Sequence, residues 1–123
     1  MLKRSDFPIK ISDMPEEHEL ITTELLFFLS DEEKKCLMDG HLSKDMDDKW
    51  NVYSEDNIIY FCRSWTGICM YKVRFLDENR IEITANRDPK QSLSTKLLPM
   101  ENMSMREEFD KYMARALLWG YSR

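Results

Sequence analysis

Four short runs of β-branched and aromatic residues in the middle of the chain limit what it can fold into. The runs span residues 49–55, 58–64, 68–75 and 80–86. They are separated by the turn segments Asp56-Asn57, Trp65-Thr66-Gly67 and Asp77-Glu78-Asn79. Val, Ile, Tyr, Phe and Trp favour strands, and connections of two to four residues join antiparallel neighbours. The pattern therefore predicts a four-stranded antiparallel meander sheet.

Alternation along these runs assigns side chains to two faces of the sheet, because successive residues of a strand point to opposite sides. One face of the last two runs carries Tyr71, Val73, Phe75, Ile81 and Ile83. The other face carries Lys72, Arg74, Glu82 and Thr84. We expect the first set to face the helices and the second to be partly solvated.

Apolar residues at helical spacing predict helices on both sides of this region. Five of them indicate a helix over residues 14–29: Leu20, Ile21, Leu25, Phe28 and Leu29. Ser30 and Glu33 have the spacing of a capping box, so a short helix is expected over 31–39. A last helix is predicted over 104–119, with an apolar face formed by Phe109, Tyr112, Met113, Ala116 and Leu117.

All of these elements fit one α+β domain over residues 1–123, a usual length for a single domain. Residues 1–12 alternate in hydrophobicity but contain Pro8, so we expect either an edge strand or an extended arm. Residues 90–103 are expected to form a polar linker to the last helix.

Composition excludes several kinds of function. The net charge of −5 argues against a nucleic-acid partner, whose binding depends on neutralising phosphates. No stretch approaches the roughly 20 apolar residues that a membrane span needs, and residues 1–30 lack the pattern of a signal peptide. These features predict a cytoplasmic protein without a membrane partner.

The cysteines and histidines indicate no metal site. The three cysteines form no CxxC pair, and His18 and His41 are isolated from them. Cys62 and Cys69 fall within predicted strands, where free cysteine is commonly buried, so we interpret both as sheet or core residues. We accordingly expect neither a metal nor another cofactor.

Residues 63–67, Arg-Ser-Trp-Thr-Gly, are more elaborate than a turn between two strands requires. Arg63 offers a two-pronged donor to phosphate or carboxylate, and Trp65 can stack on a ring. Ser64 and Thr66 can add hydroxyl donors, and Gly67 permits close backbone approach. The structural alternative is that Trp65 folds back onto the core and that Arg63 pairs with Glu55, which would contribute about 0.2–1 kcal/mol.

Arg87 follows the fourth predicted strand at the same end of the sheet as the 63–67 turn. In a meander, Arg63 and Arg87 would then converge near Trp65. The alternative for this segment is that Asp88 caps a turn before Pro89.

Residues 46–89 resemble a family of small, mostly uncharacterised bacterial proteins marked by two motifs. The first motif is Lys49-Trp50-x-x-Tyr53-x-Glu55, and the second is the run from Arg63 to Gly67. The later Asn86-Arg87-Asp88 resembles the end of the same pattern. The family has no established activity, so the resemblance implies strand boundaries and a functional bias at residues 63–67 only.

Three functions remain open. The first is a non-catalytic binding module for a small anionic or nucleotide-like ligand, bound by Arg63, Ser64, Trp65, Thr66, Arg87 and Glu55. The second is a protein-interaction or assembly role, including homo-oligomers, for which the nine methionines would provide an adaptable surface. The third is a hydrolase-type enzyme with Glu55 as base and Arg63 as anion clamp. Because the sequence shows no nucleophile–base pair, metal set or phosphate loop, binding is favoured over catalysis.

Overall fold

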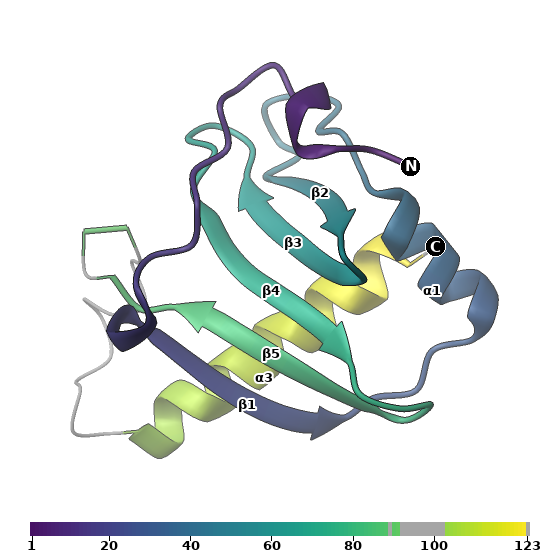
Figure 1. Ribbon diagram of the computed structural model, residues 1–123, viewed down its shortest axis with the longest axis vertical. Helices are drawn as coiled ribbons and strands as arrows, with labels where there is room; N and C mark the ends of the chain where they lie inside the picture. Colours follow the sequence, from purple (N-terminus) through teal and green to yellow (C-terminus); the bar gives the residue numbers. More distant parts are fainter. Residues whose placement is uncertain (89, 92–102, 123) are drawn as a thin grey trace.

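A computed structural model describes residues 1–88, 90–91 and 103–122, without the side chains of His18 and residues 103–107. Five antiparallel strands form one sheet in the order β1-β5-β4-β3-β2 (Figure 1). The strands are β1 (Leu20–Leu26), β2 (Trp50–Glu55), β3 (Ile58–Arg63), β4 (Cys69–Phe75) and β5 (Arg80–Asn86). The helices are α1 (Asp31–Asp39) and α3 (Met103–Tyr121), with short 3-10 turns at Arg4–Asp6 and Glu17–Glu19. No helix in these described stretches is long and apolar enough to cross a membrane.

The α+β class and the meander of β2 to β5 are confirmed, and their turns have the expected backbone geometry. Asp56 and Asn57 both have positive φ, 54° and 64°, as the tight hairpin turn between β2 and β3 requires. Gly67 also has positive φ, 73°, in the connection from β3 to β4. Local sequence therefore determines these hairpins.

The helix predicted over residues 14–29 is wrong, because Leu20–Leu26 forms the edge strand β1. All seven residues of β1 pair with β5, from Leu20 opposite Asn86 to Leu26 opposite Arg80. The run Ile21-Thr22-Thr23 is β-branched, which lowers helix propensity and suits a strand. The unpaired edge of β5 provides the hydrogen bonds that decide between the two structures. The sheet consequently has five strands instead of four.

The other two predicted helices are present. In α1, Ser30 Oγ accepts a bond from the Glu33 N–H, and Glu33 Oε1 accepts one from the Ser30 N–H, each at 3.1 Å. The last helix continues past its predicted end at residue 119 to Tyr121. The proposed linker over 90–103 lies mostly outside the described residues.

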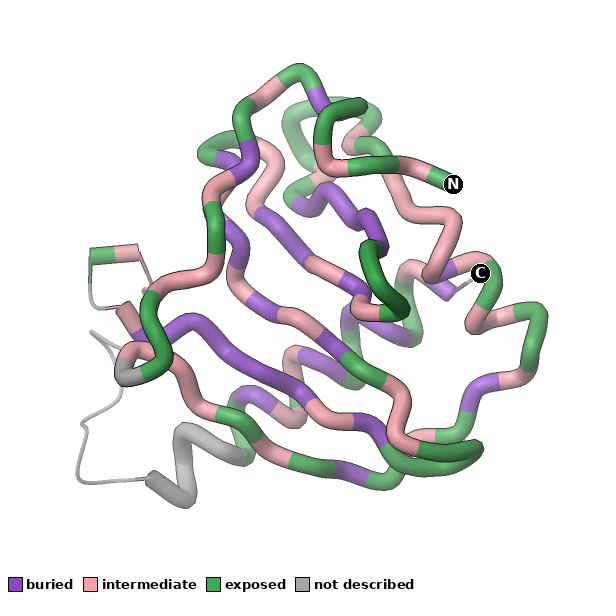
Figure 2. The backbone as a smooth tube through the Cα atoms, viewed as in Figure 1, coloured by how far each residue is buried: buried purple, intermediate pink, exposed green. Residues whose placement is uncertain are grey.

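The main core lies between the sheet and the two helices, with α3 behind β4, β5 and β1 in Figure 1. It contains the side chains expected on this face, Tyr71, Val73, Ile81 and Ile83, with Phe75 at its border. From α3 it receives Ala114, Leu117 and Leu118. Figure 2 shows the buried residues concentrated along the central strands.

The opposite face of the sheet is covered only in part. Residues 1–16, the N-terminal arm, contain no strand and pass over the ends of β2, β3 and β4 (Figure 1). Phe7 and Ile11 of the arm pack on Tyr53, Cys62 and Cys69. The part of this face formed by β1, β5 and the second half of β4 remains uncovered.

Candidate functional site

Ser64 and Trp65 of the 63–67 turn hold a neighbouring loop. Ser64 Oγ donates to the carbonyl of Asp48 at 2.9 Å, and Trp65 Nε1 donates to the carbonyl of Met46 at 3.3 Å. Thr66 Oγ1 accepts from the Ile68 N–H at 3.2 Å within the turn itself. These groups, expected to contact a ligand, therefore fasten the turn and the loop before β2.

Arg63 does not pair with Glu55, contrary to the structural alternative drawn from the sequence. Arg63 lies opposite Trp50 in the β2–β3 ladder, whereas Glu55 lies opposite Ile58 at the other end of the hairpin. Five strand residues separate the two positions by about 17 Å. The Arg63 guanidinium instead lies over the Trp50 ring, 4.9 Å from its centre. Glu55 and Arg63 are therefore too far apart to act together as the base and the anion-binding group of one hydrolase site.

Arg87 is buried and does not reach Trp65. It follows β5 at the expected end of the sheet, but its guanidinium forms an ion pair with Asp110 of α3. Burial, followed by the Asp110 carboxylate, raises the pKa of Tyr71, and the charges of Arg87 and Arg63 partly oppose this shift. The Arg87 guanidinium therefore belongs to the interior of the fold.

A hollow of about 280 Å³ lies beside Trp65, whose side chain is 58% exposed. Ser64, Lys44 and the exposed Met46 also line it. The ammonium of Lys49 lies 5.1 Å from the centre of the indole ring. The indole is therefore accessible, but neither arginine of the predicted site lines this hollow.

Asp48 connects the segment before β2 to the end of α3, a role that the sequence analysis missed. Its carboxylate contacts His41 Nε2 at 2.6 Å and accepts from the Tyr121 hydroxyl at 3.1 Å. Burial opposes ionisation, but the bonds from the Lys44 N–H, His41 and Tyr121 outweigh it and hold the pKa of Asp48 below its usual value. Only the fold brings these residues together, since Tyr121 is 73 positions away in the chain.

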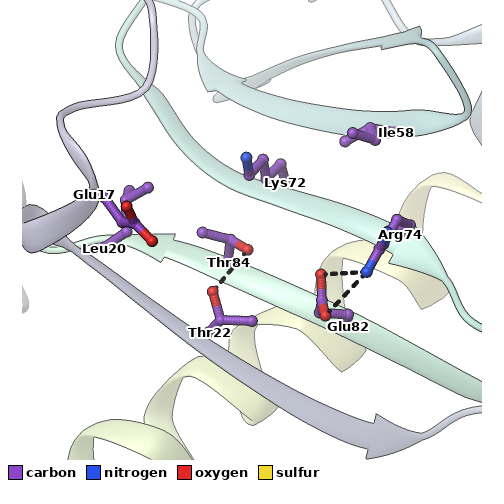
Figure 3. Close-up of a pocket in the computed structure, with 8 residues that line it drawn as sticks. All are labelled: Glu17, Leu20, Thr22, Ile58, Lys72, Arg74, Glu82 and Thr84. Atoms are coloured by element: carbon purple, nitrogen blue, oxygen red, sulfur yellow. Dashed lines mark hydrogen bonds and ion pairs between the residues drawn. The ribbon is translucent and has the colours of Figure 1, made fainter.

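The uncovered part of the sheet forms a shallow hollow of about 680 Å³ (Figure 3). Strand pairing places Thr22, Thr84, Lys72 and Tyr60 in one row across β1, β5, β4 and β3. Thr22 Oγ1 and Thr84 Oγ1 are hydrogen-bonded at 3.1 Å. Thr84, Lys72 and Thr22 all line the hollow, so the row provides it with an ammonium group and two hydroxyls.

Of the two cationic side chains that line this hollow, one forms an ion pair and the other has none among the described residues. Arg74 NH2 is bonded to Glu82 Oε1 at 3.2 Å. Lys72 forms no ion pair with any residue that the structure describes. Glu17, from the turn before β1, also lines the hollow, and Ile58 and Leu20 add apolar borders. Figure 3 shows the threonine pair between Glu17 and the Arg74–Glu82 ion pair, with Lys72 above Thr84.

A third hollow, of about 940 Å³, lies between the N-terminal arm and the end of β2. Glu55 lines it together with Ser54 and residues of the arm, so this predicted site residue is separate from the others. Arg4, which also lines this hollow, is paired with Asp13 at 2.5 Å.

Comparison of the chain with protein-family models, with curated proteins and with solved structures found no match. The sequence singled out residues 63–67, whereas the structure places a row of polar groups, through Lys72 and Thr84, in a hollow on the uncovered sheet face. The signal for this row was present in the alternation of β4 and β5. Its completion by Thr22 could not be foreseen, because residues 20–26 were interpreted as helix.

Proposed function

We propose that the protein is a non-catalytic binding module for a small organic anion, with Lys72, Thr84 and Thr22 as its binding groups. The observation that carries the proposal is the Lys72 ammonium, which lies in a hollow without an ion pair among the described residues. Residues 63–67 are not part of this site, because Ser64 and Trp65 donate to carbonyls of the chain itself and Thr66 Oγ1 accepts from the Ile68 N–H.

The hydrogen-bonding capacity of the row suits a carboxylate or phosphate oxygen. An ammonium group has three donors, and charge-assisted bonds to an anion are stronger than neutral ones. The bond between Thr22 and Thr84 uses one of the two hydroxyl hydrogens, so the second is available to a ligand. The exposed side chain of Thr22 is the one placed to offer it.

The surroundings restrict the ligand to low charge and modest size. Glu17 and Glu82 border the hollow and would repel a polyanion. Ile58 and Leu20 offer apolar contact for a short hydrocarbon part. A monoanionic organic acid fits this combination better than a polyphosphate, and nucleic acid is disfavoured by the same carboxylates and by the net charge of −5.

The test is a titration with a panel of small anions followed by NMR chemical-shift changes and calorimetry. The panel contains aliphatic carboxylates, inorganic phosphate, AMP and ADP-ribose. We expect shifts centred on β4, β5 and β1, strongest for a carboxylate. Lys72→Met, which keeps the apolar stem, should weaken that affinity at least tenfold, or about 1.4 kcal/mol.

Lys44→Met is the matched control, because Lys44 lines the hollow beside Trp65 instead of the sheet face. It should leave the affinity unchanged. The proposal is overturned if no member of the panel binds, if Lys72→Met binds like the wild type, or if the shifts gather around Trp65.

A protein-interaction role is the second candidate. It is favoured by the exposed aromatic side chains of α3, Phe109, Tyr112 and Trp119.

A further inference from the structure

The outer side of α3 carries an aromatic stripe, formed by Phe109, Tyr112, Ala116 and Trp119. The side chains of Phe109, Tyr112 and Trp119 are 37%, 67% and 58% exposed. Spacings of three, four and seven residues place the members on one side of a helix. The stripe runs from Phe109 to Trp119, ten residue steps or about 15 Å of helix.

The opposite side of α3 is the one that the fold uses. Ala114, Leu117 and Leu118 are buried against the sheet, and Asp110 is buried with Arg87. A helix covering a sheet needs one apolar side, with polar residues on the other. The packing of α3 against the sheet does not require the aromatic stripe, and contiguous exposed apolar surface of this kind marks an interaction site.

The charges beside the stripe identify the partner. Glu108 and Arg115 are exposed, and lie on the same flank of the stripe, four residues before and three residues after Tyr112. In a two-fold symmetric pair, residue i of one subunit contacts j of the other, and j contacts i. When two helices pack antiparallel around a two-fold axis, the same flank of each helix meets.

We propose that α3 packs antiparallel against α3 of a second copy of this chain, with the two-fold axis near Tyr112. In this arrangement Glu108 of each subunit faces Arg115 of the other, so the same ion pair forms twice. The two Tyr112 rings meet at the centre, where aromatic residues contribute most to binding. Within one chain, Glu108 Oε1 lies 3.7 Å from Lys111 Nζ, a long contact whose Glu108 side chain is 73% exposed, so this pair does not compete strongly.

The dimer is expected to be weak. A single pair of helices in contact over about 15 Å belongs to the class of small, transient interfaces. Association should therefore appear only as the protein concentration is raised, and sedimentation equilibrium is the suitable measurement. The dimer is independent of the anion site, because Lys72 is on the sheet face opposite α3.

The experiment uses two charge variants, Glu108→Arg and Arg115→Glu. In either variant alone, like charges face each other across the interface, so we expect at least a tenfold weaker dimer. When the two variants are mixed, all the facing charges are opposite, and a heterodimer should form with an affinity near that of the wild type. The double variant Glu108→Arg/Arg115→Glu should also recover self-association.

Aromatic variants test the stripe with a control of equal exposure. Tyr112→Ala and Trp119→Ala should weaken the dimer, whereas Trp65→Ala should not, although Trp65 and Trp119 are both 58% exposed. Circular dichroism melts confirm that each variant is folded. A wild type that stays monomeric up to millimolar concentration overturns the proposal, as does a dimer that survives both single charge variants or is lost with Trp65→Ala.

Discussion

Arg87, directly after β5, forms a buried ion pair with Asp110 of α3, and this contact ties the end of the sheet to the last helix. The guanidinium side chain is 3% exposed and the carboxylate 1%. An arginine that the sequence suggested as a ligand-binding group is therefore part of the internal framework.

Removal of one partner of this pair should destabilise the fold strongly. Arg87→Met leaves the Asp110 carboxylate buried without its main counter-charge, and losses of about 3–5 kcal/mol are typical for such changes. Urea unfolding followed by circular dichroism measures the effect. The double variant Arg87→Met/Asp110→Leu should recover part of the loss, and a single variant as stable as the wild type would show that the pair is dispensable.

Gly67→Ala should loosen the N-terminal arm. Gly67 has a φ of 73°, and a Cβ there would lie 2.0 Å from the carbonyl oxygen of Lys10. The Gly67 carbonyl also accepts a hydrogen bond from the Ser12 N–H at 2.8 Å. Because the backbone of the arm must move, we expect destabilisation of more than about 1 kcal/mol and faster amide exchange over residues 10–12.

Gly120→Ala provides the comparison, because it lies in α3 with nothing within 4 Å of the added Cβ. It should stabilise the protein by up to about 1 kcal/mol, the helix propensity difference between the two residues. Equal effects of the two substitutions would contradict the proposed close packing at Gly67.

Stability should fall at alkaline pH, with Tyr121 among the causes. Burial, with the neighbouring Asp48 carboxylate, raises the pKa of Tyr121 to about 12. A tyrosine in the unfolded chain has a pKa of about 10. The protonated form is thus favoured by folding, so the contribution is complete below pH 10 and is lost as the pH rises to about 12.

Tyr121→Phe should make this alkaline decline shallower while costing about 1 kcal/mol at neutral pH through the lost bond to Asp48. A residual slope is expected, because burial also raises the pKa of Tyr53 and Tyr71. Urea unfolding at pH 7 to 12 measures it, and an unchanged slope would refute the role of Tyr121.

Cys62 and Cys69 should resist thiol reagents in the folded protein. They pair directly across β3 and β4, and both are at most 1% exposed beneath the arm. A hydrogen bond to Cys62, followed by burial, raises the pKa of the Cys69 thiol, which lowers the amount of reactive thiolate. Mass spectrometry after iodoacetamide treatment should show Cys36, which is half-buried, modified first. Equal rates for all three would mean that the arm opens readily.

The β2–β5 meander was predictable because its causes are local. Asp56-Asn57 favours a tight hairpin, and the alternation of Tyr71, Val73, Ile81 and Ile83 assigns the buried face without knowledge of any distant residue. The capping box of Ser30 and Glu33 is likewise complete within four residues. In each case neighbouring residues supply both the pattern and the bonds that satisfy it.

The candidate site was less predictable, because side chains suited to ligand binding form hydrogen bonds with residues far away in the sequence. Ser64 and Trp65 suit ligand recognition, but the carbonyls of Asp48 and Met46 accept their hydrogens. Thr22 joined the row through Lys72 only when its segment paired with β5. The sequence gives the chemistry of these side chains, whereas their partners follow from the tertiary structure.

The sequence by itself determined the hairpins, their turns and the alternation of the sheet faces, since these follow from backbone preferences and hydrophobic period over a few residues. Tertiary structure alone decided that Leu20–Leu26 is a strand, because the open edge of β5 offered hydrogen bonds that outweighed a helical spacing of apolar residues. It also decided that Arg87 is internal, because only folding brings Asp110 of α3 against the end of β5.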